Sequence, residues 1–325
     1  MVDTDKQLLS RREFNGLCAT LCSSVPPVSA MIAVLTSAPA LAAAPGAASS
    51  GAKRTVKFRG GTIVPALGQG SAGLAQERHP EADEEEALRT GFSVGMTLID
   101  TAEIYGNGRS EELIGHAIAG QRDRVFLVTK VHPDHVMGDG IARACEASLA
   151  RLNTDHLDLY LLHWRNRHTD LSGVVASFES LRAAGKFRAW GVSNFGIGDM
   201  EDLFHVPHGD RCATNQVPYN LSSRRIEHAL LPWCGQHGIP VMAYSPLGGT
   251  STSLLHDPTL ARIGAAHGCS AAAVALAWAI RSGNVIAIPE SGSAAHVKEN
   301  AVALSLTLTL QDLQTLDAAH PPPHH

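Results

Sequence analysis

The chain has 325 residues, of which 44% are hydrophobic and 18% are charged, and its formal net charge at pH 7 is −5. This balance is typical of a globular protein rather than of a membrane or disordered one, and the length suits one large domain or two ordinary ones. A slightly acidic chain offers no basic field for a phosphate backbone, so we expect no nucleic-acid partner.

The first 54 residues differ in composition from the rest of the chain, because they are rich in Ala, Ser and Pro. Residues 1–42 contain Ser10-Arg11-Arg12-Glu13-Phe14, then a mildly apolar run, and then the small residues Ala40-Leu41-Ala42. This arrangement resembles a twin-arginine export signal that ends in a signal-peptidase site. We therefore predict a periplasmic protein in which residues 43–54 form a linker.

Two features of this segment depart from the export pattern. Asn15 and Gly16 stand where an apolar residue and Lys are usual, and Pro26 and Pro27 interrupt the apolar run. The alternative is a disordered, Ala-rich extension on a cytoplasmic protein. A membrane anchor needs about 18 or more consecutive apolar residues, and because the run is interrupted, no anchor is expected.

The cysteines give no sign of a metal or redox site. Cys18 and Cys22 lie in the predicted signal, and the other four are widely spaced, with no Cys-x-x-Cys pair: Cys145, Cys212, Cys234 and Cys269. An even number of cysteines can pair in an oxidising compartment, but spacing alone does not predict a bond. We favour buried free thiols.

From residue 55 to residue 320 the chain alternates short apolar runs with amphipathic stretches. The apolar runs are mostly continuous in hydrophobicity, as strands buried on both faces should be. We predict strands at Ala66–Gly68, Thr97–Asp100, Val125–Lys130, Leu157–His163, Ala189–Asn194, Ala213–Val217, Pro240–Ser245 and Val285–Pro289.

Helical patterns lie between these runs, the clearest at Ser110–Ala119, Gly140–Leu152, Leu171–Ala184 and Ser270–Ser282. Gly120, Gly185 and Gly283 follow three of them, as left-handed C-caps would. Eight strand–helix units predict an α/β fold, a closed (β/α)8 TIM barrel over residues 55–320, with 321–325 as a tail.

A short hairpin is predicted before the barrel. Val56–Arg59 and Thr62–Val64 flank Gly60-Gly61 and are expected to cap one mouth.

The rival architecture is an open, doubly wound sheet that binds a dinucleotide. Gly68, Gly70 and Gly73 satisfy the G-x-G-x-x-G spacing of that fold. However, residues 76–80 read as a loop rather than a helix, and no acidic residue ends the next strand at the required place. We interpret the glycines as a close-packed corner of the barrel.

Polar residues gather at the carboxyl ends of the predicted strands. They are Asp100, Lys130, His163, Ser193-Asn194, Gln216, Tyr244-Ser245 and Glu290-Ser291. In a barrel these ends converge on one face, where active sites are built. The sequence therefore predicts one site.

Asp100, Lys130, His163 and the nearby Tyr105 form a set suited to carbonyl reduction. The phenol of an unperturbed tyrosine has a pKa of about 10, and a neighbouring ammonium lowers that pKa so that the phenol can give a proton to a carbonyl oxygen. A carboxylate fixes the lysine, and a histidine can orient the carbonyl. A hydride donor is needed nearby.

The segment Asp100-Thr101-Ala102-Glu103-Ile104-Tyr105-Gly106-Asn107 resembles the aldo-keto reductase signature D-T-A-x-x-Y-G-N. The resemblance extends from residue 55 to about 323, and its nearest subgroup is bacterial reductases of small dicarbonyls and keto-sugars. It implies an NAD(P)H-dependent oxidoreductase that converts an aldehyde or ketone to an alcohol, with Tyr105 as general acid assisted by Asp100, Lys130 and His163.

The resemblance also implies the cofactor contacts. Nicotinamide would be held by Ser193, Asn194 and Gln216 and stacked on Tyr244. The rest of the dinucleotide would meet Ser245, Leu247, Glu290, Ser291, His296, Glu299 and Asn300.

The adenosine end departs from the family pattern at two positions. Glu290 stands where NADPH-preferring members commonly carry Lys or Arg, and His296 replaces an Arg. A carboxylate would repel a 2′-phosphate and accept hydrogen bonds from a ribose diol. We expect NADP(H) as cofactor, with NAD(H) or dual use favoured by Glu290.

The expected substrate pocket includes Ala72, where the family often has Trp, together with Trp164 and Arg165. Ala72 would open the pocket, and Arg165 would either meet an anionic or hydroxylated substrate or pair with solvent. Methylglyoxal-like compounds or keto acids are the expected substrates of a monomeric enzyme.

Two other functions compete with this interpretation. One is a nucleotide-binding, redox-sensing or regulatory barrel with little turnover, as in the family's potassium-channel β subunits. The other is a metal-dependent hydrolase, which would need several His and Asp ligands on separate strand ends. His132-Pro133-Asp134-His135 reads as a solvated loop, and no metal is expected.

Overall fold

The computed structural model describes residues 53–249 and 251–322. The predicted export signal, the linker up to residue 52, and residues 323–325 of the predicted tail lie outside the described residues.

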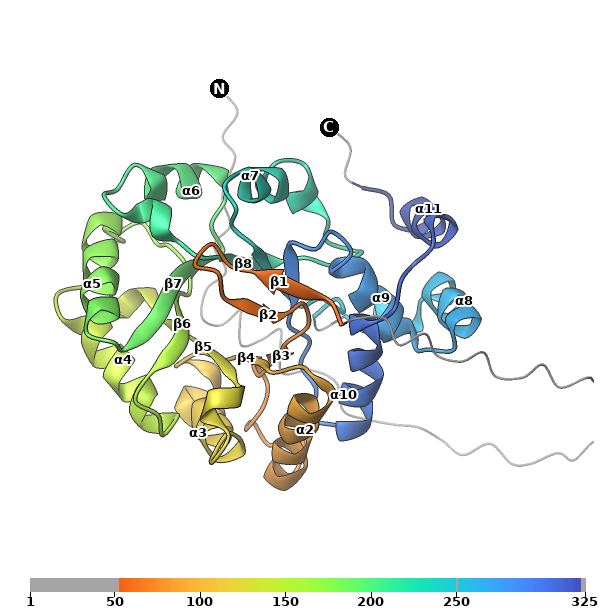
Figure 1. Cartoon of the computed structure of the whole chain (residues 1–325), viewed down its shortest axis with the longest axis horizontal. Coiled ribbons are helices and arrows are strands. Elements are labelled where there is room, and N and C mark those ends of the chain that lie inside the picture. The colour runs from red at the N-terminus through yellow and green to blue at the C-terminus, as the bar shows by residue number, and fades with distance from the viewer. Residues whose placement is uncertain (1–52, 250, 323–325) are drawn as a thin grey trace, which may run out of the picture. The chain divides into compact units, whose positions relative to one another are not determined.

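The centre of the described unit is a ring of eight parallel strands (Figure 1). They follow one another in chain order: β3 (Gln69–Gly70), β4 (Leu98–Asp100), β5 (Phe126–Val131), β6 (Leu157–Leu162), β7 (Phe187–Ser193), β8 (Asn215–Pro218), β9 (Val241–Tyr244) and β10 (Val285–Ala287). Parallel bridges from Leu67 to Ala287 and from Gly70 to Glu290 join the first strand to the last. The predicted (β/α)8 barrel is confirmed.

Helices surround the strands on the outside of the ring (Figure 1). They are α2 (Glu81–Val94), α3 (Arg109–Ala117), α4 (Gly140–Arg151), α5 (Leu171–Ala183), α6 (Ile197–Phe204), α7 (Leu230–Gln236), α8 (Pro258–His267), α9 (Ala271–Ala279), α10 (Ala294–Ala301) and α11 (Leu310–Ala319). Short 3-10 turns are η1 (Tyr105–Gly108), η2 (Arg122–Arg124), η3 (Pro133–His135), η4 (Gly209–Arg211), η5 (Arg225–Glu227), η6 (Ser253–His256) and η7 (Val302–Leu304).

The predicted helix ends agree with the structure to within three residues. Gly120, Gly185 and Gly283 have φ values of 72°, 76° and 76°, so the left-handed conformation expected after three of the helices is present. Among the described residues no single helix is long and apolar enough to cross a membrane. The pair α8 and α9 reaches that length and composition jointly, but its members meet at 93°.

The first barrel strand lies later than predicted, at Gln69–Gly70 instead of Ala66–Gly68. Here the backbone is packed closely on its neighbours. A Cβ at Gly68 would lie 2.6 Å from Leu98 Cδ2, and one at Gly70 would lie 2.8 Å from the Ile288 carbonyl oxygen. Glycine is therefore required where the first strand meets the last, which hydrophobic periodicity does not reveal.

The predicted hairpin is present, with β1 (Thr55–Lys57) and β2 (Ile63–Pro65) paired antiparallel. Gly61 has a φ of 90°, which suits the tight turn. The Phe58 ring stacks on Phe126, the first residue of β5, with centroids 5.5 Å apart. The hairpin, which crosses in front of the strands in Figure 1, therefore covers the amino-terminal mouth of the barrel.

The described cysteines are all free thiols. Burial raises the pKa of Cys145, Cys212 and Cys234 to about 12 and also raises that of the partly buried Cys269. The expectation of buried free thiols is confirmed for the first three, which are poor nucleophiles.

Candidate active site

A buried ion pair lies where β4 ends and β5 runs beside it. The Lys130 ammonium donates to Asp100 Oδ2 at 2.7 Å and to the Thr101 carbonyl at 2.7 Å. Gln216, from β8, donates to the other Asp100 oxygen at 2.7 Å. The partners come from β4, β5 and β8 and from the residue after β4, so barrel closure itself assembles the pair.

Burial and mutual attraction oppose each other in this pair. Burial raises the pKa of Asp100, while Lys130 and Gln216 act to lower it. Burial likewise lowers the pKa of Lys130, while Asp100 acts to raise it. Each charge compensates the other, so removing one partner would leave an isolated charge in a medium that solvates it poorly.

Tyr105 follows β4 and reaches the same point. Its hydroxyl oxygen lies 3.4 Å from the Lys130 ammonium, which also sits 5.0 Å from the centre of the phenol ring. The chain turns sharply after it, because Gly106 and Asn107 both take left-handed conformations, with φ of 57° and 56°. Glycine and asparagine are the residues that adopt this conformation at least cost.

His163 is the first residue after β6 and lies edge-on to Tyr105, with ring centroids 5.7 Å apart. Burial, followed by the charge of Lys130 and then by His132, holds the pKa of His163 well below its usual range. Its ring is therefore neutral at neutral pH. Its buried Nδ1 finds no hydrogen-bond partner among the described residues.

A hydrogen-bonded row of side chains lies beside His163. Asn194 Nδ2 donates to the His163 carbonyl at 3.1 Å, and Tyr244 donates to Asn194 Oδ1 at 2.9 Å. Ser193 donates to the Gln216 carbonyl at 2.9 Å. Burial raises the pKa of Tyr244 to about 12, so its phenol stays protonated.

This row fits the nicotinamide end of a dinucleotide. Tyr244 is half-buried and presents an aromatic ring, and the amide and hydroxyl groups beside it match the needs of a carboxamide. The His163 carbonyl also accepts from this row, through Asn194. The residues that would hold the ring are Ser193, Asn194, Gln216 and Tyr244.

The loop after β9 carries two further predicted cofactor residues. Ser245 has a φ of 50°, and its carbonyl accepts a hydrogen bond from Asn220 Nδ2 at 2.9 Å. Leu247 packs partly buried against the core. Sequence analysis missed Asn220, because its role appears only when the loops after β8 and β9 lie side by side.

The residues predicted for the adenosine end differ in exposure. Asn300 is buried, whereas His296 and Glu299 are exposed on α10. Ser291 hydrogen-bonds to the carbonyl of Ser293, the N-cap residue of α10.

Glu290 has partners on the loop after β3. The Gly73 amide donates to its Oε2 at 2.5 Å, and Arg78 forms an ion pair with its Oε1. The sequence could not reveal this contact, because it joins segments more than 200 residues apart.

The predicted pocket residues lie around the same mouth, and Arg165 is paired with carboxylates there. Its guanidinium pairs with Asp199 at 3.0 Å and with Asp202 at 2.7 Å, both on α6. Its charge is therefore already compensated by two carboxylates. Ala72 is exposed, and Trp164 is half-buried with its ring 4.8 Å from that of His163.

The His132–His135 string is held in place by a residue of the signature segment. Glu103 Oε1 accepts from the His132 amide at 2.5 Å and contacts His135 Nδ1 at 2.9 Å. The His132 ring packs edge-on against Trp164, 4.6 Å away. Among residues 53–249 and 251–322, no three His, Cys, Asp or Glu side chains gather as a metal site would require.

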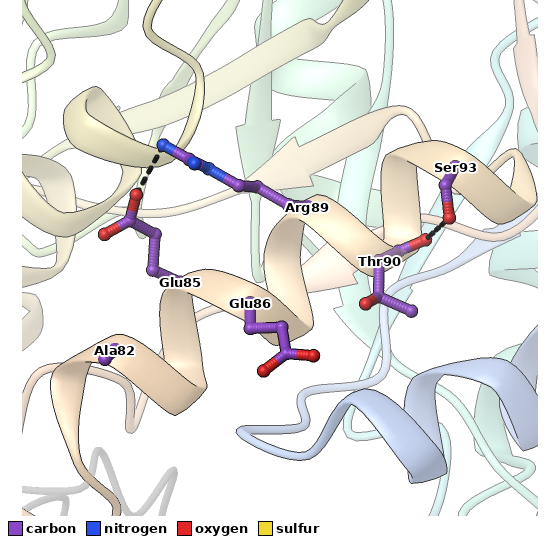
Figure 2. Close-up of a pocket in the computed structure, with 6 residues that line it drawn as sticks. All are labelled: Ala82, Glu85, Glu86, Arg89, Thr90 and Ser93. Carbon is purple, nitrogen blue, oxygen red and sulfur yellow. Dashed lines mark hydrogen bonds and ion pairs between the residues drawn. The ribbon is translucent and has the colours of Figure 1, made fainter.

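A shallow hollow on the outer face of α2 offers no competing site (Figure 2). Its lining comes from one helix alone: Ala82, Glu85, Glu86, Arg89, Thr90 and Ser93. Glu85 and Arg89 form an ion pair at 2.5 Å across one helical turn, the ordinary pattern of a solvated helix face.

Comparison with known proteins agrees with this geometry. The family model described as the aldo/keto reductase family matches residues 66–321. Methylglyoxal reductase YeaE of Escherichia coli is 47% identical over 274 residues, covering 83% of this chain and 96% of that protein.

Solved structures agree as well. An aldo/keto reductase from Klebsiella pneumoniae, in complex with NADP and acetate, is 46% identical with a TM-score of 0.80, covering 84% of this chain and 98% of that one. A structure of an aldo-keto reductase from the same organism with NADPH gives the same identity and TM-score and covers 97% of that chain.

The chain belongs to the aldo/keto reductase family, whose members are oxidoreductases that use nicotinamide cofactors.

Proposed function

We propose that this protein reduces an aldehyde or ketone group of a small dicarbonyl compound to an alcohol, with Tyr105 as the proton donor. The observation that carries the proposal is the position of the Lys130 ammonium. It lies 2.7 Å from an Asp100 oxygen and 3.4 Å from the Tyr105 hydroxyl. An ammonium held beside a phenol stabilises the phenolate, and so makes the phenol a better acid.

NAD(P)H, when bound, supplies a hydride to the carbonyl carbon. As the C–H bond forms, the π electrons of the C=O bond move to its oxygen. The Tyr105 hydroxyl gives that oxygen its proton, which completes the alcohol, and the resulting phenolate recovers a proton from solvent. Lys130 stabilises the phenolate in the interval, and Asp100 keeps the ammonium in place.

His163 orients the substrate in this scheme. A neutral imidazole can donate one N–H to the carbonyl oxygen without introducing a second buried positive charge beside Lys130. The low pKa of His163 keeps it in that form. Its ring packs between Tyr105 and Trp164, which leaves it little freedom to turn away.

The side chains around the mouth favour a small, uncharged substrate such as methylglyoxal. His132 and Trp164 pack against one another beside His163, and Arg165, the one cation predicted to meet an anionic substrate, is paired with two aspartates. The YeaE relative is named a methylglyoxal reductase. A 2-oxo acid is therefore the weaker candidate.

Turnover with a substrate panel tests this function. Oxidation of NADPH and of NADH is followed with methylglyoxal, a simple aldehyde and pyruvate. We expect the highest kcat/KM with methylglyoxal and the lowest with pyruvate. Nucleotide binding without turnover of any carbonyl would favour the regulatory alternative instead.

The cofactor preference is proposed to extend from NADP(H) to NAD(H). Glu290 stands where a cation would otherwise meet the 2′-phosphate, and its negative charge acts against that group. The ratio of kcat/KM values for NADPH and NADH measures the preference. A ratio of about 100 or more in favour of NADPH, a difference of about 2.7 kcal/mol, would contradict dual use.

Export by the twin-arginine route is proposed from Ser10-Arg11-Arg12-Glu13-Phe14. The test compares the full chain with an R11K/R12K double variant in fractionated bacterial cells. We expect the wild-type chain in the periplasm, shortened near residue 42, and the variant in the cytoplasm at full length. A wild-type chain recovered at full length in the cytoplasm would refute export.

A further inference from the structure

Three residues form a clasp between the loop after β3 and the loop after β10. Glu290 accepts a hydrogen bond from the Gly73 amide at 2.5 Å, and its other oxygen is paired with Arg78. Arg78 Nε in turn donates to the Gly73 carbonyl at 3.0 Å. We call Gly73, Arg78 and Glu290 the Glu290 clasp.

Gly73 is part of the clasp because it has no side chain. A Cβ at this position would lie 1.1 Å from Arg78 Nη2 and 2.7 Å from Glu290 Oε1. The guanidinium therefore occupies the space that any other residue would fill. This accounts for the third glycine of the G-x-G-x-x-G spacing, which barrel packing leaves unexplained.

The neighbours of the clasp bring these two loops together over several residues. A Cβ at Gly292 would lie 2.5 Å from His79 Cδ2 and 3.3 Å from Glu84 Cγ. Glu84 is buried, with one oxygen accepting from the Ala75 amide at 2.7 Å. The charged groups that act on Glu290 are Arg78 and Glu84, and His79 lies against Gly292.

The Glu290 clasp contains a cation as well as a carboxylate, and that cation is able to bind a phosphate. A lone carboxylate at position 290 would repel a 2′-phosphate, yet the structure places a guanidinium in contact with that carboxylate. Arg78 is half-exposed, with 51% of its side chain accessible, so it can turn without leaving a buried cavity. Guanidinium groups bind phosphate oxygens in the same forked geometry as they bind carboxylates.

We propose that Arg78, carried by the loop after β3, is the cation that binds the 2′-phosphate of NADP(H), and that Glu290 competes with the phosphate for it. The inference rests on the proposed function, because it assumes that the adenosine end of the cofactor lies at Glu290. When the phosphate takes Arg78, the Gly73 amide remains as a hydrogen-bond donor to Glu290. A nucleotide without the phosphate leaves the clasp closed.

Binding of two fragments isolates the 2′-phosphate from the rest of the cofactor. Adenosine 2′,5′-bisphosphate and adenosine 5′-monophosphate differ by that one group, and calorimetry measures the affinity of both without turnover. We expect R78Q to weaken the bisphosphate by about tenfold or more, as for the loss of a charge-assisted contact. E290Q should strengthen it several-fold, and neither variant should change monophosphate binding by more than about twofold.

Arg89 and Glu85 supply a matched control. Their ion pair on α2 has nearly the same exposure, 51% and 27%, as the pair of Arg78 and Glu290, at 51% and 25%. R89Q and E85Q therefore remove the same charges from the same chain on the outer face shown in Figure 2. Both should leave the binding of either fragment unchanged.

The binding results distinguish failure of the proposed Arg78 role from failure of the proposed cofactor site. If R78Q leaves the ratio of the affinities for the bisphosphate and the monophosphate unchanged, the proposed role of Arg78 is refuted. If E290Q fails to strengthen the bisphosphate, competition by Glu290 is refuted. If the wild-type chain binds neither fragment nor NAD(P)H, the proposed cofactor site itself is wrong, whatever the variants show.

Discussion

Two buried aspartates on the barrel strands that flank β5 have very different surroundings. Asp100, at the carboxyl end of β4, and Asp158, near the amino end of β6, are each 3% exposed. Asp100 holds the fully buried Lys130. Asp158 accepts from the Leu127 amide at 2.9 Å and pairs with Arg122 at 2.9 Å and Arg188 at 3.1 Å.

The cations make the difference between the two sites. Arg188 has 66% of its side chain exposed, so the Asp158 cluster meets solvent and fixes one strand against the next. Lys130 has no contact with solvent, and its charge is directed at Asp100 and Tyr105. Burial of a carboxylate is therefore a poor guide to function. The exposure of its partner and the end of the barrel at which it lies are more informative.

The largest expected effect is on the chemistry at the carboxyl end. Y105F removes the proposed proton donor and should lower kcat by about 10²- to 10⁴-fold, with little change in nucleotide affinity. Y160F is the matched control, because the Tyr160 hydroxyl is buried without a hydrogen-bond partner among the described residues. It should leave kcat unchanged. Steady-state kinetics with methylglyoxal would decide, and near-wild-type turnover in Y105F would exclude its role.

Replacement of each aspartate by asparagine tests whether Asp100 and Asp158 have different roles. D100N leaves the Lys130 ammonium buried without its counterion, so we expect a loss of about 3–5 kcal/mol in the free energy of unfolding together with a lower kcat. D158N should cost about 1–3 kcal/mol and leave kcat per folded molecule unaltered. Denaturant unfolding measures the free energy of unfolding, and kinetics normalised to the active enzyme measure kcat. An equal loss of kcat in both variants would contradict different roles for the two aspartates.

The amino-terminal mouth should contribute stability alone. F58A removes the ring that stacks on Phe126 and should lower the free energy of unfolding by about 3 kcal/mol, without changing kcat. I63A alters the same hairpin at a residue that is 63% exposed, so its effect should stay within about 0.5 kcal/mol. A fall in kcat of the folded F58A enzyme would show that the two mouths are coupled.

The smallest effect concerns the pH dependence of stability. The folded-state pKa of His163 is lowered. As pH falls below about 6.5, the unfolded chain therefore takes up a proton that the folded chain refuses, and stability is lost. H163Q should reduce this slope by up to about 1.4 kcal/mol per pH unit between pH 6.5 and pH 5.

H168Q, at an exposed histidine, is the control and should leave the slope as it is. Unfolding curves at several pH values give the comparison. Identical slopes for H163Q and the wild-type chain would mean that His163 is protonated in the folded state.

The barrel and the order of its strands could be predicted from the sequence, because hydrophobic period and helix caps are local properties of the chain. The polar residues that stand at strand ends could be predicted as well, since a strand end is fixed by the same period. Seven of the eight predicted strands therefore agree with the structure to within two residues at each end. The exception is the first barrel strand, which lies later than predicted. At Gly68 and Gly70 close packing rather than hydrophobicity sets the position of the strand.

The pairing of charged residues could not be predicted from the sequence. Glu290 meets Arg78 and Gly73, Arg165 meets two aspartates of α6, and Glu103 holds the His132–His135 turn. Each contact joins two different elements of the barrel, and no period in the sequence reports the direction in which a loop side chain points. Charged groups select their partners by distance and desolvation, and both quantities exist only once the barrel has closed.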